Sequence, residues 1–309
     1  MRAKSTLMFT IILSLGLILI AGGCRRSRHY GAEAKRNPEE KIAPSDAAAA
    51  ASPAPTIADK GGEGIDFPEQ EKISRTYRLI PGMRVSISNI NGKIDVETAD
   101  TDTAEVLIVR SAKTKEDLQF NNIIINHQPK HLRITVENDR KSIWSALGKG
   151  PEGRQRVMLR LPRRVEFATN GLNGELNVGE LDGEVEINGV NGNVKIAQAT
   201  GEAKFRGVNG NINLTLSGLA DGIDLNGVNG NTEIGFIGPV NATIDAWGMN
   251  GSVESNLPNF EVKETEGFGR YEARIGIGGP QIEIRGVNGN LNLVKSLKQP
   301  VTATKTATR

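Results

Sequence analysis

A five-residue sequence, Gly-Val-Asn-Gly-Asn, recurs along this chain and constrains its fold more than any other feature. Copies begin at Gly189, Gly207, Gly227 and Gly286, and looser copies are NINGK at 89–93, GLNGE at 171–175 and GMNGS at 248–252. The asparagines that precede the second glycine, from Asn173 to Asn250, are spaced by 18, 18, 20 and 21 residues, and Asn288 follows after 38, or two steps of 19. A period near 20 is too short for a helical hairpin or a propeller blade and suits one coil of a β-solenoid.

Between the copies, apolar and polar residues alternate, as at 184–188 and 193–196, which is the pattern of half-buried strands. Each coil of about 18–21 residues is therefore predicted to hold two short parallel strands. One corner is the repeated motif, because Asn-Gly tolerates the positive φ values of a tight reversal. Asn-Gly is also a strong hairpin signal, so an antiparallel meander is the alternative. We favour the solenoid because the corner and its flanks recur in register, so that like residues stack.

The alternation also predicts which side chains point into the core. They are Val178, Val185, Ile187, Val194, Ile196, Phe205, Ile212, Leu214, Ile223, Leu225, Ile234, Ile244, Val253, Ile282, Ile284, Leu291 and Leu293. The apolar residue of each corner is expected to join them: Ile90, Leu172, Val190, Val208, Val228, Met249 and Val287. The corner residues Asn191, Asn209, Asn229 and Asn250 are expected to lie about 4.8 Å apart and to form a ladder of amide hydrogen bonds.

Residues 1–24 are predicted to be a lipoprotein-type signal peptide. Arg2 and Lys4 precede an apolar run at 7–20 that is short for a membrane span, and the run ends in Ile-Ala-Gly-Gly-Cys24. This ending resembles the lipobox of bacterial lipoproteins, which implies that Cys24 is lipidated. Ala21 departs from the usual Leu, and the arginines at 25, 26 and 28 disfavour translocation. An uncleaved anchor and ordinary secretion are the alternatives.

Composition divides the rest of the chain. Residues 25–70 are rich in Ala and Pro, lack apolar periodicity and are predicted to be a disordered tether, with a degenerate first domain as the alternative. Residues 71–297 are predicted to be the all-β domain, and 298–309 a disordered tail. In its more divergent N-terminal half, we expect strands up to Leu161, a helical turn at 114–120, a loop at 141–153 and about four coils between Asn91 and Asn173. The lone cysteine excludes an internal disulfide bond.

Three of these features together resemble the bacterial putative-adhesin family of unknown function. They are the Asn-Gly corners, the strand-rich segment that ends in Val157-Met-Leu-Arg-Leu-Pro162, and the Gly-rich stretch before a last Val-Asn-Gly-Asn-Leu corner. Residues 73–294 carry the resemblance. It implies a β-solenoid on an exported or membrane-tethered protein and brings no catalytic or binding residues. The expected location is the bacterial cell envelope, at the outer membrane or cell surface, with the lipid anchor contacting the membrane.

Few residues suggest a cofactor or metal, and we expect neither. His127 and His131 have a metal-like helical spacing, but Pro129 lies between them. The glycines at 276–279 lack the Lys-Ser/Thr of a phosphate loop, and the repeats lack the calcium-binding pattern of β-rolls. A net charge of +2 predicts no nucleic-acid partner, and the arginines at 154–164 suit a solvated edge better than a polyanion site because no aromatic residues interleave with them.

Two columns of outward side chains suggest specific sites, one catalytic and one ligand-binding. Aligned strands place Glu186, Lys204, Asp224 and Asp245 in one column, with Asp224 and Asp245 about 5 Å apart, the spacing of a retaining glycosidase pair. Two solvated acids are the plainer interpretation. The next column holds Asn188, Arg206, Asn226, Trp247 and Arg285. Trp247 is either a sugar-stacking platform or a side chain that shields a corner, and with Arg206 and Arg285 it forms a candidate ligand surface.

The sequence thus favours a non-enzymatic envelope lipoprotein whose β-solenoid is a structural or adhesive module for an envelope glycan or protein. One alternative is a carbohydrate-active solenoid enzyme that uses Asp224 and Asp245. Another is a self-associating scaffold, which would need an uncapped last coil near Leu293; the polar tail from Lys295 onward argues against it.

Overall fold

The computed structural model describes residues 67–138, 153–219, 221–264 and 269–297. The chain separates into two compact units, Met1–Ala50 and Ala51–Arg309, and every described residue belongs to the second. The predicted signal peptide with Cys24, the tether as far as residue 66, the loop at 141–152 and the tail at 298–309 lie outside the described residues. Within the described ranges, no helix is long and apolar enough to cross a bilayer.

The described residues are all-β, as predicted. They form 20 strands of one sheet, which curls round an apolar core and is nearly closed. The helical turn expected at 114–120 is α1 (Lys115–Phe120), which begins where the side chain of Thr114 accepts a hydrogen bond from the backbone N–H of Asp117.

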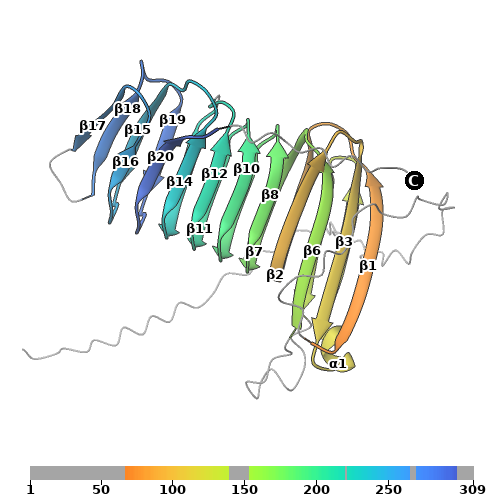
Figure 1. Ribbon diagram of the computed structural model, residues 1–309. Helices are drawn as coiled ribbons and strands as arrows, with labels where there is room; N and C mark the ends of the chain where they lie inside the picture. Colours follow the sequence, from red (N-terminus) through yellow and green to blue (C-terminus); the bar gives the residue numbers. More distant parts are fainter. Residues whose placement is uncertain (1–66, 139–152, 220, 265–268, 298–309) are drawn as a thin grey trace, which may run out of the picture. The chain divides into compact units, whose positions relative to one another are not determined.

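Most strands lie in two halves of the sheet that face each other across the core, and we call these sheet A and sheet B (Figure 1). Neighbouring strands are parallel in both orders that follow. Sheet A runs β6 (Gly153–Pro162), β2 (Met83–Ala99), β8 (Leu176–Leu181), β10 (Val194–Ala199), β12 (Ile212–Leu216), β14 (Thr232–Phe236), β20 (Leu291–Lys295) and β16 (Val253–Ser255). Sheet B runs β5 (His131–Asn138), β2, β7 (Val165–Asn173), β9 (Val185–Asn191), β11 (Ala203–Asn209), β13 (Ile223–Asn229), β19 (Gln281–Arg285) and β15 (Ala242–Trp247). The repeats therefore pair in parallel from layer to layer.

Antiparallel strands extend both ends of this parallel region. At the end that carries β2, β3 (Thr103–Ala112) pairs with β6, β1 (Glu69–Arg78) pairs with β3, and β4 (Asn121–Gln128) pairs with β5. At the other end, β18 (Tyr271–Ile275) pairs with β15, and β17 (Phe260–Glu264) pairs with β18. The meander considered as an alternative thus describes only the ends of the described region.

The two glycines of each corner are needed for different reasons. The first, as at Gly207 with φ +62°, adopts a left-handed backbone. The second, as at Gly210, has φ +153° and lies so close to the preceding layer that a Cβ there would be 2.2 Å from the carbonyl oxygen of Gly192. The described non-glycine residues with positive φ are Asn89 and Asn259, so the expected positive φ at the repeated asparagines was wrong. Five of these asparagines, at 91, 173, 191, 209 and 229, continue their strands, and those at 250 and 288 form isolated β-bridges.

The repeated asparagines form the predicted amide ladder. In the order Asn91, Asn173, Asn191, Asn209, Asn229, Asn288, Asn250, each side-chain nitrogen after the first donates to the amide oxygen of the preceding residue at 3.0–3.2 Å. The side-chain nitrogen of Asn91 donates to the carbonyl oxygen of Gly153. A second ladder uses the last residue of the motif, since the backbone N–H of Asn211 donates to the side chain of Asn193, and that of Asn231 to Asn211, both at 3.0 Å. Side-chain hydrogen bonds therefore join the layers at the corner in addition to the backbone pairing.

The core matches the predicted alternation. All the predicted inward residues and all the apolar corner residues are buried, and none of them exposes more than 9% of its surface to solvent. Sheet B contributes Phe205, which is fully buried and stacks between Ile187 and Leu225 of the adjacent layers. Full burial of an aliphatic or aromatic side chain stabilises a fold by about 1.5–3 kcal/mol, so each layer depends on its neighbours for most of its stability.

The N-terminal half differs from the expected run of about four coils. β2 pairs directly with β7 and β8, so that Asn91 lies opposite Asn173 although 82 residues separate them. The residues between them instead form β3, α1 and the strands β4 to β6, which lie on the far side of β2 or beyond it. The strands expected within this stretch are present, but their pairing is not a repetition of the later coils.

The order of the last layers also differs from the chain order. β13 pairs with β19 rather than with β15, and β14 pairs with β20 rather than with β16. The chain places β15 and β16 at the end, forms the β17–β18 hairpin, and returns to insert β19 and β20 into the gap. Leu293 is consequently inside the sheet and not in its last layer.

Candidate ligand-binding surface

The changed layer order separates the two acids proposed as a catalytic pair. In the outward column of sheet B, Asp224 lies opposite Glu283, and Glu283 lies opposite Asp245. Asp224 and Asp245 are therefore two strand spacings apart, or about 9.6 Å between backbones. The 5 Å separation of a retaining glycosidase pair is not present, and that prediction was wrong because it took the layers in chain order.

Each of the first two acids in this column also contacts an arginine. Asp224 lies 3.3 Å from Arg206, and the Nε of Arg285 donates to Glu283 at 2.8 Å. This hydrogen bond to Glu283 raises the pKa of Arg285 above its ordinary value. These carboxylates are thus engaged in ion pairs within the sheet surface.

The neighbouring column brings together the residues of the predicted ligand surface. The register runs Arg206, Asn226, Arg285, Trp247, so that Arg285 lies between Asn226 and Trp247. The guanidinium carbon of Arg285 lies 5.7 Å from the centre of the Trp247 ring, within the range of a cation–π contact. Trp247 remains 51% exposed. Because half of this ring faces solvent, Trp247 does not simply shield a corner.

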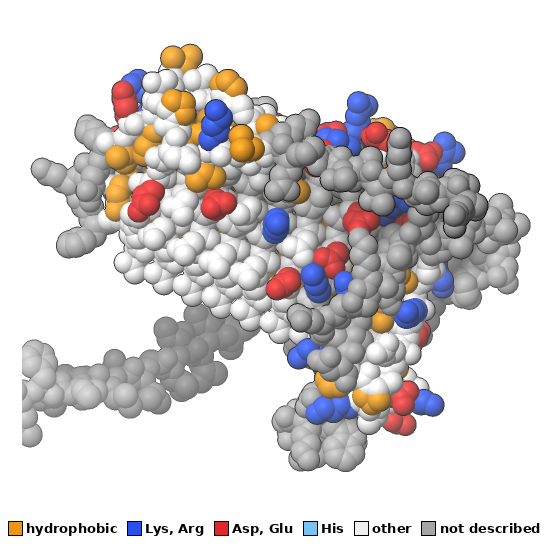
Figure 2. Space-filling model, in the orientation of Figure 1, with side chains coloured by type: hydrophobic (Ala, Val, Ile, Leu, Met, Phe, Trp, Pro, Cys, Tyr) orange, Lys and Arg blue, Asp and Glu red, His pale blue; other side chains and the backbone are white. Residues whose placement is uncertain are grey.

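An open hollow of about 840 Å³ adjoins the β15 strand that carries Trp247. Sheet B and the β17–β18 hairpin supply its polar lining, which consists of Thr243, Asp245, Gln281, Glu261, Glu272 and Arg274, and Val262 of β17 also lines it. Figure 2 shows hydrophobic side chains gathered at the end that carries β15, β17 and β18, where Val262 and Ile277 are 50% and 88% exposed. We call Trp247, Arg285 and this hollow the Trp247 surface. The sequence analysis missed the β18 side of it because the alternation at 260–264 and 271–275 was not recognised as a hairpin.

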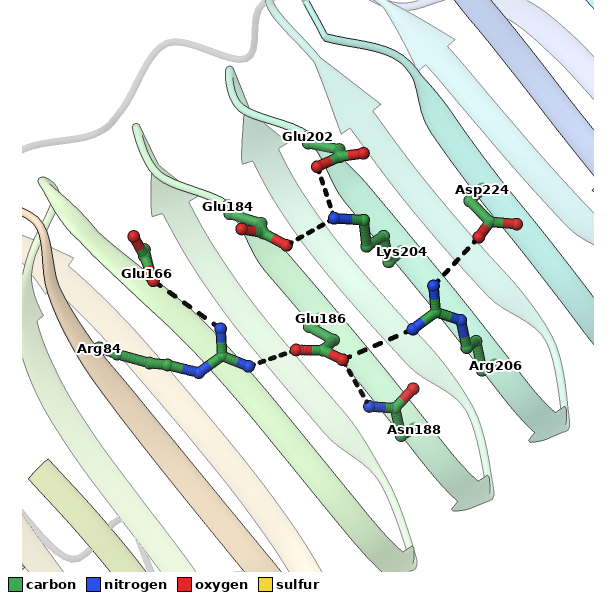
Figure 3. Close-up of polar contacts among 9 residues, drawn as sticks. All are labelled: Arg84, Glu166, Glu184, Glu186, Asn188, Glu202, Lys204, Arg206 and Asp224. Carbon is green, nitrogen blue, oxygen red and sulfur yellow. Dashed lines mark hydrogen bonds and ion pairs between the residues drawn. The ribbon is translucent and has the colours of Figure 1, made fainter. Parts of the chain in front are cut away.

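A chain of ion pairs crosses sheet B beside this surface (Figure 3). Arg84 of β2 contacts Glu166 of β7 at 3.8 Å and Glu186 of β9, and Glu186 contacts Arg206 of β11 at 3.6 Å. Arg206 then reaches Asp224 of β13. Alternating charges thus link strands across the sheet, and they hold Arg206, a predicted ligand residue, in place.

Two titratable groups in this region have shifted pKa values. Hydrogen bonds from Asn188 and Arg84 lower the pKa of Glu186 below its ordinary value. Hydrogen bonds to Glu202 and Glu184 raise the pKa of Lys204, whose ammonium lies 2.6 Å and 3.0 Å from their oxygens. Both shifts favour the charged forms, as expected for residues that hold neighbouring strands together.

We expect Glu186→Gln to lower the free energy of unfolding by about 1 kcal/mol at neutral pH, because the carboxylate loses its charge-assisted bonds with Arg84 and Arg206. A carboxyl whose pKa is lowered by folding stabilises the fold above its unfolded pKa and loses this effect as pH falls through the folded pKa. The difference between wild type and variant should therefore shrink in acid. Urea unfolding over a pH series measures it.

Glu166→Gln is the control for this series, since Glu166 makes a single 3.8 Å contact with the same arginine. It should lower stability by about 0.5 kcal/mol or less. A Glu186→Gln effect that is independent of pH would contradict the assignment.

The two histidines contact different groups. The Nε2 of His131 lies 2.7 Å from the Ser86 hydroxyl on β2, and burial, followed by Arg133, lowers its pKa. The Nε2 of His127 lies 3.2 Å from the carbonyl oxygen of Arg78, and its ring packs 5.1 Å from that of Tyr77. Within the described ranges, no group of three or more His, Cys, Asp or Glu residues is arranged to hold a metal ion.

The arginine cluster at 154–164 lies among acidic side chains of neighbouring strands. The ion pairs join Arg156 to Asp95, Arg160 to Glu105, and Arg163 to Glu180 and Asp182, with distances from 2.7 to 3.7 Å. The positive charge of these arginines is therefore locally compensated. β6 lies between β2 and β3, and the Arg156 side chain is 11% exposed, so the expectation of a solvated edge was wrong for this strand.

Comparison with known proteins yields structural matches alone, since no family model and no curated protein matches the sequence. A putative cell adhesion protein from Clostridium sporogenes is 12% identical, covers 73% of this chain and 100% of its own, and has a TM-score of 0.38. A putative adhesin from Bacteroides fragilis is 9% identical over 74% of this chain and 99% of its own, with a TM-score of 0.29. A putative lipid-binding protein from Parabacteroides distasonis is 9% identical over 73% of this chain and 96% of its own, with a TM-score of 0.25. The first two are named as adhesion proteins, and the resemblance of this chain to the bacterial putative-adhesin family rests on its own repeats and corners.

Proposed function

We propose that this chain is a non-enzymatic binding module of the bacterial cell envelope, a β-solenoid that holds a glycan on its Trp247 surface. The observation that carries the proposal is the half-exposed indole of Trp247, fixed by Arg285 beside a polar hollow. Flat aromatic rings stack on the apolar faces of sugars, and nearby amides, carboxylates and guanidiniums bind sugar hydroxyl groups.

The solenoid assignment is supported by the parallel register of the repeats. Each repeat supplies one strand to sheet A and one to sheet B, and equivalent residues meet in adjacent layers, as Val208 does with Val190 and Val228. A binding surface on such a scaffold is rigid, because its side chains rise from hydrogen-bonded strands. Rigid presentation reduces the entropy lost when a ligand binds.

The envelope location is supported by the sequence at the N-terminus. A basic start, a short apolar run and Cys24 at its end suit lipidation after export, and residues 25–70 suit a tether that holds the domain away from the membrane. A non-enzymatic role is supported by the wide separation of Asp224 and Asp245 and by the ion pair between Asp224 and Arg206.

Glycan arrays and sedimentation with purified envelope polysaccharide test the proposal, using the full chain. We expect Trp247→Ala to weaken binding at least tenfold, about 1.4 kcal/mol, because the ring supplies the stacking area. Trp247→Phe keeps an aromatic face and should retain part of the affinity. Ile80→Ala is the control, since it removes an exposed apolar side chain between β1 and β2, and Ile80 does not line the hollow of the Trp247 surface. Unchanged binding by Trp247→Ala, or no binding of any glycan by the wild type, would overturn the proposal.

A further inference from the structure

β4 is the last described strand of sheet B at the end opposite to Trp247. Among the described strands it pairs with β5 alone, so the backbone groups along its other edge have no strand partner there. An unpaired edge can add a further strand from another chain, and proteins commonly prevent this with charged side chains or proline.

β4 lacks this protection, unlike two other edge strands. Its sequence, Asn-Asn-Ile-Ile-Ile-Asn-His-Gln, contains no Asp, Glu, Lys, Arg or Pro. The edge strand β1 contains Glu69, Glu71, Lys72, Arg75 and Arg78, and the edge strand β17 contains Glu261, Lys263 and Glu264. β4 is therefore the most permissive of these three edges.

The sequence of β4 is also self-complementary. Residues 122–126 read Asn-Ile-Ile-Ile-Asn in both directions, with Ile124 at the centre. In an antiparallel pair with a two-fold axis at Ile124, Asn122 meets Asn126 of the second copy, and Ile124 meets its own equivalent. This register pairs even-numbered residues with even-numbered ones. Alternate residues of a strand direct their N–H and C=O groups toward the same edge, so the groups at the free edge of one copy lie opposite those at the free edge of the other.

Side chains on the outer face of sheet B fit the same register. Asn122, Ile124 and Asn126 are exposed, and Ile124 is 42% exposed. On β5, Glu137 lies beside Asn122 and Arg133 lies beside Asn126. The two-fold pairing would therefore place Glu137 of one copy and Arg133 of the second in the same row, with the two asparagines between them. The charges that flank the edge are complementary, and the apolar residue lies on the axis.

We propose that two copies of this chain associate through β4, edge to edge and antiparallel, about a two-fold axis at Ile124. The pairing joins the two copies of sheet B into one continuous sheet. It closes as a dimer, because each copy uses its β4 edge once. The Trp247 surfaces then lie at opposite ends of the joined sheet, since β15 and β4 are at opposite ends of sheet B in each copy. The inference does not depend on what the Trp247 surface binds.

Disulfide cross-linking in the full chain tests this register, with Cys24 replaced by Ser so that the introduced thiol is the only one. At the axis, the two Cα atoms of Ile124→Cys would be about 4.5–5.5 Å apart, which suits a disulfide bond. We expect mild oxidation to convert this variant into covalent dimers. Asn122→Cys alone should remain uncross-linked, since its equivalents would be about 13 Å apart, whereas a mixture of Asn122→Cys and Asn126→Cys should cross-link.

Sedimentation gives an independent measurement without cysteine. Ile124→Lys places like charges at the axis and should convert the dimer to a monomer, whereas Val262→Lys, which adds the same charge to the β17 edge, should leave the dimer intact. Circular dichroism checks that both variants are folded. A wild-type monomer at all concentrations, cross-linking of Asn122→Cys alone, equal effects of the two lysine variants, or assembly into fibrils would overturn the proposal.

Discussion

Gly210→Ala is expected to lower the free energy of unfolding by about 3 kcal/mol or more, one of the largest effects of any single methyl group in this chain. The new Cβ would lie 2.2 Å from the carbonyl oxygen of Gly192 and 2.5 Å from its carbonyl carbon, and both belong to the backbone of the adjacent layer. No side-chain rotation can relieve this contact, so the two layers must move apart at the corner. Urea unfolding followed by circular dichroism measures the loss.

Gly218→Ala is the matched control. Gly218 lies outside the corners, and a Cβ there would have no atom within 4 Å. Its effect should stay within about 0.5 kcal/mol, and it can be favourable because alanine restricts the unfolded chain. Equal stability of the Gly210 and Gly218 variants would show that adjacent corners are not in close backbone contact, and the layer register would then be wrong.

Phe205→Ala is the second large effect, with an expected loss of about 3–5 kcal/mol. The Phe205 ring is fully buried between Ile187 and Leu225 of the adjacent layers, so its removal leaves a cavity bounded by rigid strands. Because stability in a layered protein is shared between neighbours, the damage is expected to extend to β9 and β13. Hydrogen exchange of their backbone amides, together with urea unfolding, measures both the size and the spread of the effect.

Phe205→Leu separates loss of volume from loss of the aromatic ring. Leucine fills most of the space and should cost about 1.5 kcal/mol or less. If alanine and leucine at this position lowered the free energy of unfolding by equally small amounts, the centre of the core would be loosely packed, contrary to the burial of Phe205 and its neighbours. If the exchange rates changed only in β11, the layers would be less coupled than their shared core indicates.

The fold could be predicted from sequence to the extent that local patterns specify it. Alternation identified the buried set from Val178 to Leu293, since a strand that turns one face inward must bury every second residue. The corner motif identified both glycines, although the Asn was assigned the wrong backbone conformation. The pairing between Asn91 and Asn173 could not be predicted in this way, because β3 pairs in antiparallel fashion with β6, which is distant in sequence. β4 and β5 form an antiparallel hairpin that is not part of the repeat.

The candidate site was predicted in part. Trp247, Arg206 and Arg285 do share one column, because a common register follows from a common repeat. Two other features depend on which strand lies next to β13: the contact of Arg285 with Trp247, and the separation of Asp224 from Asp245. Chain order predicts β15 in this position, whereas the structure has β19 there. The polar hollow depends on the β17–β18 hairpin, which lies outside the repeat.

The sequence by itself determined the repeat, the inward residues and the asparagine ladder, because each follows from contacts that any two adjacent repeats make. Only the tertiary structure decided the order of the last two layers, since the corners at 248–252 and 286–290 can both pair with the one at 227–231. In the structure, the corner at 286–290 pairs with the one at 227–231. The side chain of Asn290 accepts a hydrogen bond from the backbone N–H of Ser252, and the backbone N–H of Asn290 donates to the side chain of Asn231. Ser252 takes the position of the ladder asparagine in the last described layer, beyond which no described strand of sheet A requires an amide acceptor. The looser copy of the motif therefore ends the stack for a physical reason that the period alone does not contain.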